Sequence, residues 1–402
     1  MVTSELNVLE PSQTNDIKKV CYTDTTTHLL ITGLWPYKHT KFTKVYRIIC
    51  ASGFFNNCIL QLLIYINTSF TSSLLSHDLL DVIVSLSFCL LYSTLWHKLD
   101  IIKEIMDIVQ QDWRTVRNLE DFNILTKYAK EGIRHSRYFR LFMYSTMMIG
   151  SIFYAINFTK LLNIPDSRSL PIWMHTIVKE KCLHYIYYCI FCVIMFLANA
   201  TSIATESIST MTFQHLRSLF EIASNRIKEA FIYNSLHDST SSRTFKMTES
   251  LKSSIHLHVK CIKVVMYLKQ TYMMLSFLLC GFGVLILGIS MFLCFQSYLL
   301  HEINYTFLYV IICMIEIVCL FRVNYTTQTM LDSYNNVFVE LYNIEWYEAP
   351  LHVQKIILFM MLKYSFPLSF NMFGVFSACM EGFSSLAKMT LSYFMVIYST
   401  MR

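Results

Sequence analysis

The last stretch of the chain, residues 366–402, constrains the fold most, because it is apolar over a membrane-spanning length and yet carries charge. From Phe370 to Tyr398 it is long enough to cross a bilayer as a helix. Glu381 and Lys388 lie in its middle, and a charged side chain at membrane depth is costly unless it faces protein or water. The sequence therefore predicts a spanning helix that gives its charges a polar surrounding.

The polar residues of this stretch share one helix face. At 100° per residue, Val396 lies on the same face and Thr400 lies beside it. The polar residues of the face are Glu381, Ser385, Lys388, Ser392 and Ser399. The opposite face carries Phe383, Leu386, Thr390, Phe394 and Ile397. Two interpretations remain open: the polar face lines a water-filled path, or it bonds to neighbouring helices inside a bundle.

The composition of the whole chain indicates an all-α polytopic membrane protein. Of its 402 residues 54% are hydrophobic and only 15% are charged, whereas about a quarter of a soluble domain is charged. The net charge of +6 follows the two sides of the predicted spans, so we expect no nucleic-acid partner. Residues 1–44 hold no apolar core, so we expect no cleaved signal peptide.

Seven apolar stretches are predicted to be transmembrane helices of one single domain. They lie at about 45–67, 79–96, 138–162, 182–204, 272–299, 305–321 and 370–398. A tail at 1–44 precedes them. Between the sixth and seventh spans, residues 328–364 are predicted to form interfacial anchor helices, interrupted by Pro350.

The distribution of Lys and Arg predicts the orientation of these spans. The segments on one side hold 25 such residues and those on the other side hold three. Because basic loops stay in the cytoplasm, we expect a cytoplasmic N-terminus and anchor region and an extracellular C-terminus. This orientation is opposite to that of G-protein-coupled receptors.

Both ends of the chain resemble the insect odorant receptors, which are odour-gated cation channels with this inverted orientation. The last helix contains Ser392-Tyr393-Phe394-Met395-Val396, and Gly33-Leu34-Trp35-Pro36 precedes the first span. The resemblance extends over the chain in length and span order. It implies an odour-specific subunit in the plasma membrane of a sensory neuron, assembled as a heterotetramer with the shared co-receptor. The co-receptor itself is longer, with a larger second inner loop than residues 213–263.

The resemblance also implies which residues bind odorant and which gate the channel. A mostly apolar cavity between the outer halves of the spans holds a small hydrophobic odorant in the family. The matching positions are Phe88, Met147, Gly150, Tyr154, Tyr188, Cys192, Tyr305 and Tyr309. The gate, an apolar ring contributed by each subunit near the outer end of the last helix, falls on Val396 and Thr400. Ser399, Ser392, Lys388 and Glu381 are the further candidates for the cation path.

One position departs from the family pattern, and the buried charges leave alternatives open. Thr400 is polar where the family has a larger apolar residue. This difference indicates a subunit whose gate is completed by its partner subunits. Glu316, Glu381 and Lys388 either pair within the protein or across a subunit contact, or, for Glu381 and Lys388, line the ion path.

Other functions have weaker support in the sequence. A gustatory receptor channel of the same superfamily usually ends on a pattern with a glutamine that is absent after Tyr393. A non-conducting seven-span receptor is a further alternative. A membrane hydrolase needs clustered His and Asp within its spans, and here only His97, His184 and His301 come near span ends. His256 and His258 lack a third ligand, so we expect no metal site, no cofactor and no enzyme activity.

Overall fold

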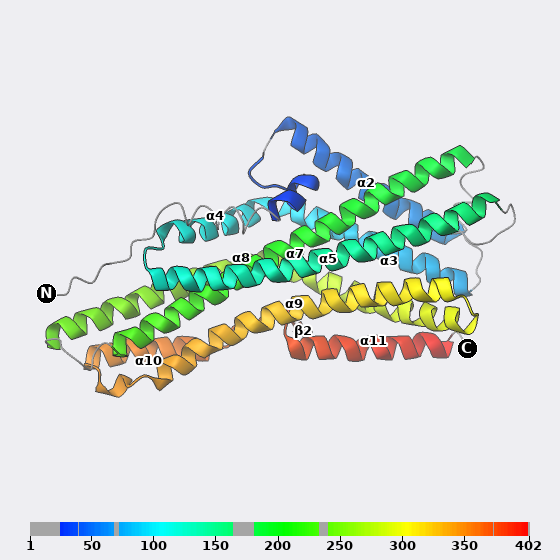
Figure 1. Ribbon diagram of the computed structural model, residues 1–402. Helices are drawn as coiled ribbons and strands as arrows, with labels where there is room; N and C mark the ends of the chain where they lie inside the picture. The colour runs from blue at the N-terminus through cyan, green and yellow to red at the C-terminus, as the bar shows by residue number, and fades with distance from the viewer. Residues whose placement is uncertain are drawn as a thin grey trace.

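Long helices running side by side form the protein, as the ribbon diagram shows (Figure 1). The computed structural model describes residues 25–38, 40–67, 72–163, 181–232, 240–372 and 374–400. After a helical segment at 25–31 the helices are α2 (Lys41–Asn67), α3 (Ser72–His97), α4 (Leu99–Thr115), α5 (Leu119–Asn163), α7 (Lys181–Ile232), α8 (Thr240–Leu299), α9 (Ile303–Asn343), the short 3₁₀ helix η2 (Trp346–Glu348), α10 (Leu351–Ser365) and α11 (Met380–Thr400).

The all-α polytopic architecture predicted from composition is confirmed. Four helices of the described residues are long and apolar enough to cross a membrane: Asp78–His97, Cys189–Phe231, Thr244–Leu299 and Ile303–Asn343. The stretches predicted at 45–67 and 138–162 are helical as well, within α2 and α5. Helices α7 and α8 continue far beyond their predicted spans, as their apolar spacing indicates. The loop predicted at 163–181 lies almost wholly outside the described residues.

The predicted start of the last span was wrong. Residues 370–372 and 374–379 are not helical; they include the strands β1 (Asn371–Met372) and β2 (Phe376–Ser377), which pair antiparallel, and α11 begins only at Met380. Gly374 turns the chain with a φ of 75°, a conformation that glycine adopts without strain. Phe370 and Met372 are buried in the core. The apolar side chains of this segment therefore pack against the rest of the protein.

The largest core lies at the end of the bundle that we call the basic end, built from residues 97–140, 213–263 and 322–365. There α4, α5, α7, α8, α9 and α10 share one cluster of buried side chains. Its fully buried members include Leu216, Phe220, Val264, Met330 and Val353. Burial of each such side chain contributes roughly 1.5–3 kcal/mol, so this end is the rigid base from which the longer helices project.

The tetrad at Gly33–Pro36 forms the corner that leads into α2. Gly33 has a φ of 73°, which favours glycine. The guanidinium of Arg47 donates to the carbonyl of Gly33 at 2.6 Å, and the Tyr92 hydroxyl donates to the carbonyl of Thr32 at 3.0 Å. The corner therefore fixes α2 against α3 through backbone carbonyls.

Candidate functional site

Helix α11 lies along the outside of the bundle, beside α9 (Figure 1). Its polar face points away from the rest of the chain: Glu381, Ser385, Lys388, Ser392, Val396, Ser399 and Thr400 are all exposed. The Val396 side chain, for example, has 58% of its surface accessible. The spacing predicted that these residues share a face, and the structure turns that face outward.

The opposite face of α11 packs against α8 and α9. Leu386 and Thr390 are buried, and the Phe383 ring meets Phe321 of α9 edge to face, with ring centroids 5.6 Å apart. Against α8 the approach is closest at Gly288, where an added Cβ would lie 2.6 Å from Cδ1 of Tyr393. A glycine here lets the two helices approach each other, as small residues do between membrane helices.

The polar face of α11 does not bond to neighbouring helices of the same chain. Among the described residues, neither Glu381 nor Lys388 has an ion-pair partner. The hydroxyls of Ser385 and Thr400 donate to carbonyls one turn earlier in α11, those of Glu381 and Val396, at 3.0 Å each. The described residues therefore do not support the interpretation in which this face bonds to neighbouring helices of the same chain.

The residues predicted to bind odorant belong to four helices, α3, α5, α7 and α9. Phe88 of α3 packs at the edge of a cluster with α2, α4, α7 and α8, whereas Tyr305 and the buried Tyr309 of α9 join a different cluster with α8, α11 and an earlier part of α3. An added Cβ on Gly150 would meet nothing within 4 Å. Met147 and Cys192 are half-buried. The side chains of Tyr154 and Tyr188 lie outside the described part of the chain, so this pocket stays a prediction.

Glu316 is a third charge within a predicted span. It sits on α9 and faces α8, because a Cβ added to Gly283 would lie 3.3 Å from its Oε2. Within the described residues its carboxylate has no ion pair. The expectation that it pairs inside the protein is therefore not met among these residues.

A buried ion pair that sequence reasoning missed joins α7 to α9. Glu206 Oε1 lies 2.6 Å from one terminal nitrogen of Arg322, and the side chains expose only 10% and 16% of their surfaces. Thr210 accepts a further bond from Arg322 at 3.2 Å, and the guanidinium lies over the Phe139 ring, 5.2 Å from its centroid. Both charges therefore have partners in a place where isolated charges would be costly.

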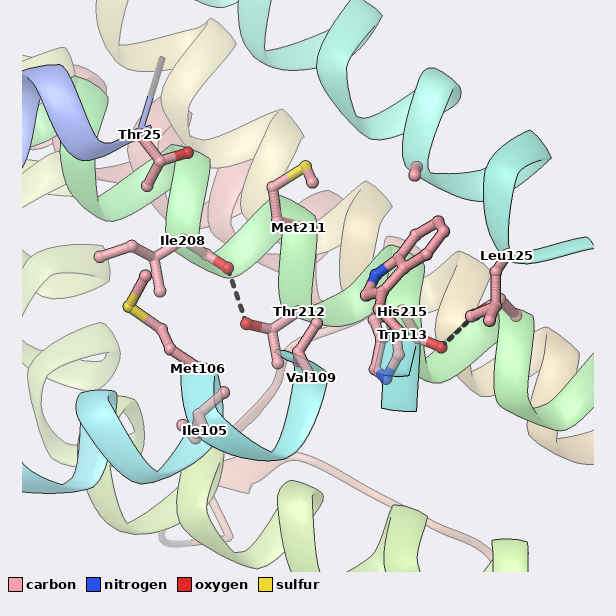
Figure 2. Close-up of a pocket in the computed structure, with 12 residues that line it drawn as sticks. Thr25, Ile105, Met106, Val109, Trp113, Leu125, Ile208, Met211, Thr212 and His215 are labelled. Carbon is pink, nitrogen blue, oxygen red and sulfur yellow. Dashed lines mark hydrogen bonds between the residues drawn. The ribbon is translucent and has the colours of Figure 1, made fainter. Parts of the chain in front are cut away.

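A second buried charge network lies at the basic end, beside a cavity of about 30 Å³ between α4, α5 and α7. Figure 2 shows Trp113 of α4 close to His215 of α7 at this cavity. The Asp112 carboxylate accepts from His215 Nε2 at 2.9 Å and pairs with the Lys260 ammonium. Burial lowers the pKa of His215 to about 4, and Lys260 already balances the charge of Asp112, so His215 is a neutral donor.

This neutral histidine makes stability depend on pH. Because the unfolded chain gains a proton on His215 below pH 6.5 and the folded chain does not until about pH 4, stability falls over that range as the pH is lowered. At pH 5 we expect a loss of about 2 kcal/mol relative to pH 7. Thermal unfolding of the detergent-solubilised chain measures it. H215Q, which keeps a donor but cannot titrate, is expected to show a shallower pH dependence; an equal slope would contradict the assignment.

Comparisons with known proteins agree with this fold. The family model described as 7tm Odorant receptor matches residues 77–391. The olfactory receptor OR5 from the insect Machilis hrabei, in complex with eugenol, superposes with a TM-score of 0.77 at 13% identity, covering 96% of this chain and 100% of that one. A second structure of that receptor gives a TM-score of 0.71 at 14% identity, covering 95% and 97%. No curated protein sequence matches the chain.

The helical bundle and the apolar spans define a multi-pass membrane protein. The family match covers well over half of the sequence, so the chain belongs to the 7tm odorant receptor family. The predicted relationship to the insect odorant receptors is thereby confirmed, whereas the two end motifs, at 33–36 and 392–396, lie outside the matched residues.

Proposed function

We propose that this chain is the odour-binding subunit of a ligand-gated, non-selective cation channel in the plasma membrane. It assembles with the shared odorant receptor co-receptor, and its ligand is a small hydrophobic odorant bound among the outer halves of the helices. Binding shifts the population of the channel towards a conducting state without a G protein or an enzymatic step. The many Lys and Arg residues of the basic end support a cytoplasmic location for that end.

The observation that carries the proposal is the exposed polar face of α11. The charged side chains of Glu381 and Lys388 would be unfavourable if they faced lipid. That cost is removed if they face a central aqueous path shared by several subunits. Val396 then lies near the outer end of the path, where an apolar ring blocks ions by excluding water. Thr400, one turn further, makes this ring polar in part, which favours a heteromer whose other subunits complete the gate.

The need for other subunits is also supported by the surface of the anchor region. Helices α9 and α10 expose large apolar side chains at the basic end. They include Tyr342, Leu351, Phe359 and Leu362, each more than half accessible. Exposed apolar patches of this kind mark protein contacts, so we assign this face to assembly with the co-receptor.

Cysteine substitution at Val396 tests the proposal. In cells that express V396C together with the co-receptor, a water-borne thiol reagent is expected to reduce the odour-evoked current by at least about half, because the side chain borders the aqueous path. Whole-cell recording with an odour panel measures the current. The matched control is L386C on the buried face of the same helix, which is expected to be insensitive.

Three outcomes would each contradict a different part of the proposal. If V396C stays insensitive in resting and stimulated cells, α11 does not line the path. If co-expression gives an odour response only when a G protein is active, the chain is a non-conducting receptor. A current that needs no co-receptor would contradict the heteromer alone.

A further inference from the structure

A second cavity lies nearer the basic end than the predicted odorant region. Its volume is about 190 Å³, and its walls come from α3, α5, α7, α8, α9 and the segment between α10 and α11. On α9 it is lined by Cys319 and Val323, ten and fourteen positions after the predicted odorant residue Tyr309, or about 15 and 20 Å along the helix. On α3 it is lined by Leu91, one turn after the predicted odorant residue Phe88. The cavity therefore adjoins the predicted odorant region at α3 and extends from it towards the basic end.

The lining of this cavity is mostly apolar, with hydroxyls gathered on one wall. The Tyr272 hydroxyl is buried and faces Ser209, but no hydrogen bond of full geometry joins it to another described residue; both residues line the cavity. By contrast, the hydroxyls of Thr326 and Thr327 donate to carbonyls of their own helix at 2.8 and 2.9 Å. A buried donor without a well-formed hydrogen bond is unfavourable, so the Tyr272 hydroxyl is available to an acceptor in the cavity.

The size and polarity of the cavity select its occupant. An apolar cavity of about 150 Å³ in another protein takes up benzene, so this one has room for a single ring with a small substituent. The hydroxyls of Tyr272 and Ser209 suit a carbonyl or ether oxygen on that ring. The class of ligand is therefore a compact, apolar molecule with one hydrogen-bond acceptor.

One wall of the cavity leads directly into the candidate pore helix. Phe370, Met372 and Ala378 line the cavity and belong to the segment that precedes α11. The Ala378 amide donates to the Phe370 carbonyl at 3.1 Å, and the amide of Met380, the first residue of α11, donates to Gln328 of α9 at 3.3 Å. A molecule that presses on this wall therefore acts on the start of α11.

Phe370 is also held from the opposite side of the segment. Its ring meets Phe213 of α7 edge to face, with centroids 5.8 Å apart, and the Lys269 ammonium of α8 lies 5.4 Å from its centroid. The segment is thus clamped between three helices that also line the cavity. Such packed contacts transmit a displacement instead of absorbing it.

We propose that this cavity is an allosteric site for compact acceptor-bearing molecules, distinct from the odorant pocket, and that its occupant changes the position of α11. The effect on gating rests on the proposed channel function. Binding itself does not, so the two parts are tested separately.

Binding is measured as thermal stabilisation of the full-length chain in detergent micelles. Cyclohexanone is the probe, and methylcyclohexane, with a methyl group in place of the carbonyl oxygen, is its control without an acceptor. We expect saturable stabilisation by both. Y272F is expected to weaken cyclohexanone binding about fivefold, the loss of one neutral hydrogen bond, and to leave methylcyclohexane binding unchanged.

Filling the cavity separates specific binding from partition into the micelle. S276F places a ring in the cavity and is expected to abolish stabilisation by both probes, whereas S276A, which keeps the space, is expected to bind as the natural chain does. If S276F does not unfold cooperatively, S202M on the facing helix α7 takes its place. Equal stabilisation of the filled variant and the natural chain would overturn the proposal, because the cavity then holds water only.

Gating is measured in cells that also express the co-receptor. Cyclohexanone is expected to shift the odour concentration that gives half-maximal current about fivefold or more, a usual size of allosteric coupling, and S276F is expected to remove the shift. Specific binding without any shift would overturn the coupling to α11. An absence of odour-evoked current in every cell would instead overturn the proposed function and leave the binding result intact.

Discussion

Replacement of Arg322 by methionine is expected to leave little folded protein at the cell surface. Arg322 and Glu206 join α7 to α9 through a contact of 2.6 Å with both side chains mostly buried. Removal of the cation leaves the carboxylate buried without its partner, which costs roughly 3–5 kcal/mol. Because a whole domain is stable by only about 5–15 kcal/mol, this single change removes much of the stability. Surface biotinylation and thermal unfolding in detergent measure the loss.

The partner residue provides the sharpest control for that change. The double variant E206L/R322M replaces both charges by apolar groups, so no charge is left unpaired, and we expect it to recover most of the lost surface expression. K252M breaks a pair with Glu249 whose side chains are more than half exposed, and such a surface pair contributes little. If the single and double variants at the buried pair were equally defective, the loss would come from packing and not from charge.

The sequence predicted the helix faces well because they depend on a fixed period. The alternation of polar and apolar residues along α11 repeats with the helix, so spacing alone predicted that Lys388 and Val396 share one face. These features are local, and a single sequence records them.

Features that depend on contacts between distant residues were missed. Glu206 and Arg322 each lie just beyond a predicted span and are 116 positions apart, so neither was recognised as a buried charge. The start of α11 was misplaced because hydropathy alone cannot distinguish an apolar strand pair from a helix turn. Gly374, which precedes the charged residue Glu381 in the sequence, was the available signal for a turn. The odorant pocket depends on spacing between helices, which no sequence period encodes.

Gly382 lies in the first turn of α11 at the point where the chain passes from strand to helix. It is buried, and an added Cβ would overlap the carbonyl oxygen of Ser377 and lie 2.6 Å from Cε2 of Phe376. Since the carbonyl belongs to the backbone of the strand pair, it cannot rotate away as a side chain can. G382A is therefore expected to displace the start of α11 at a cost of about 3 kcal/mol or more, and to lower the odour-evoked current at least about tenfold.

The direction of this effect is what makes the test decisive. Helix propensity alone predicts that alanine stabilises a helical glycine position by about 1 kcal/mol, which is what we expect of G281A in α8, where an added Cβ meets nothing within 4 Å. The two variants make the same chemical change in two helices of one protein, so their currents and melting temperatures compare directly. A G382A channel as active as G281A would mean that the strand pair yields easily, and that α11 is not held at its first turn in the way the buried glycine indicates.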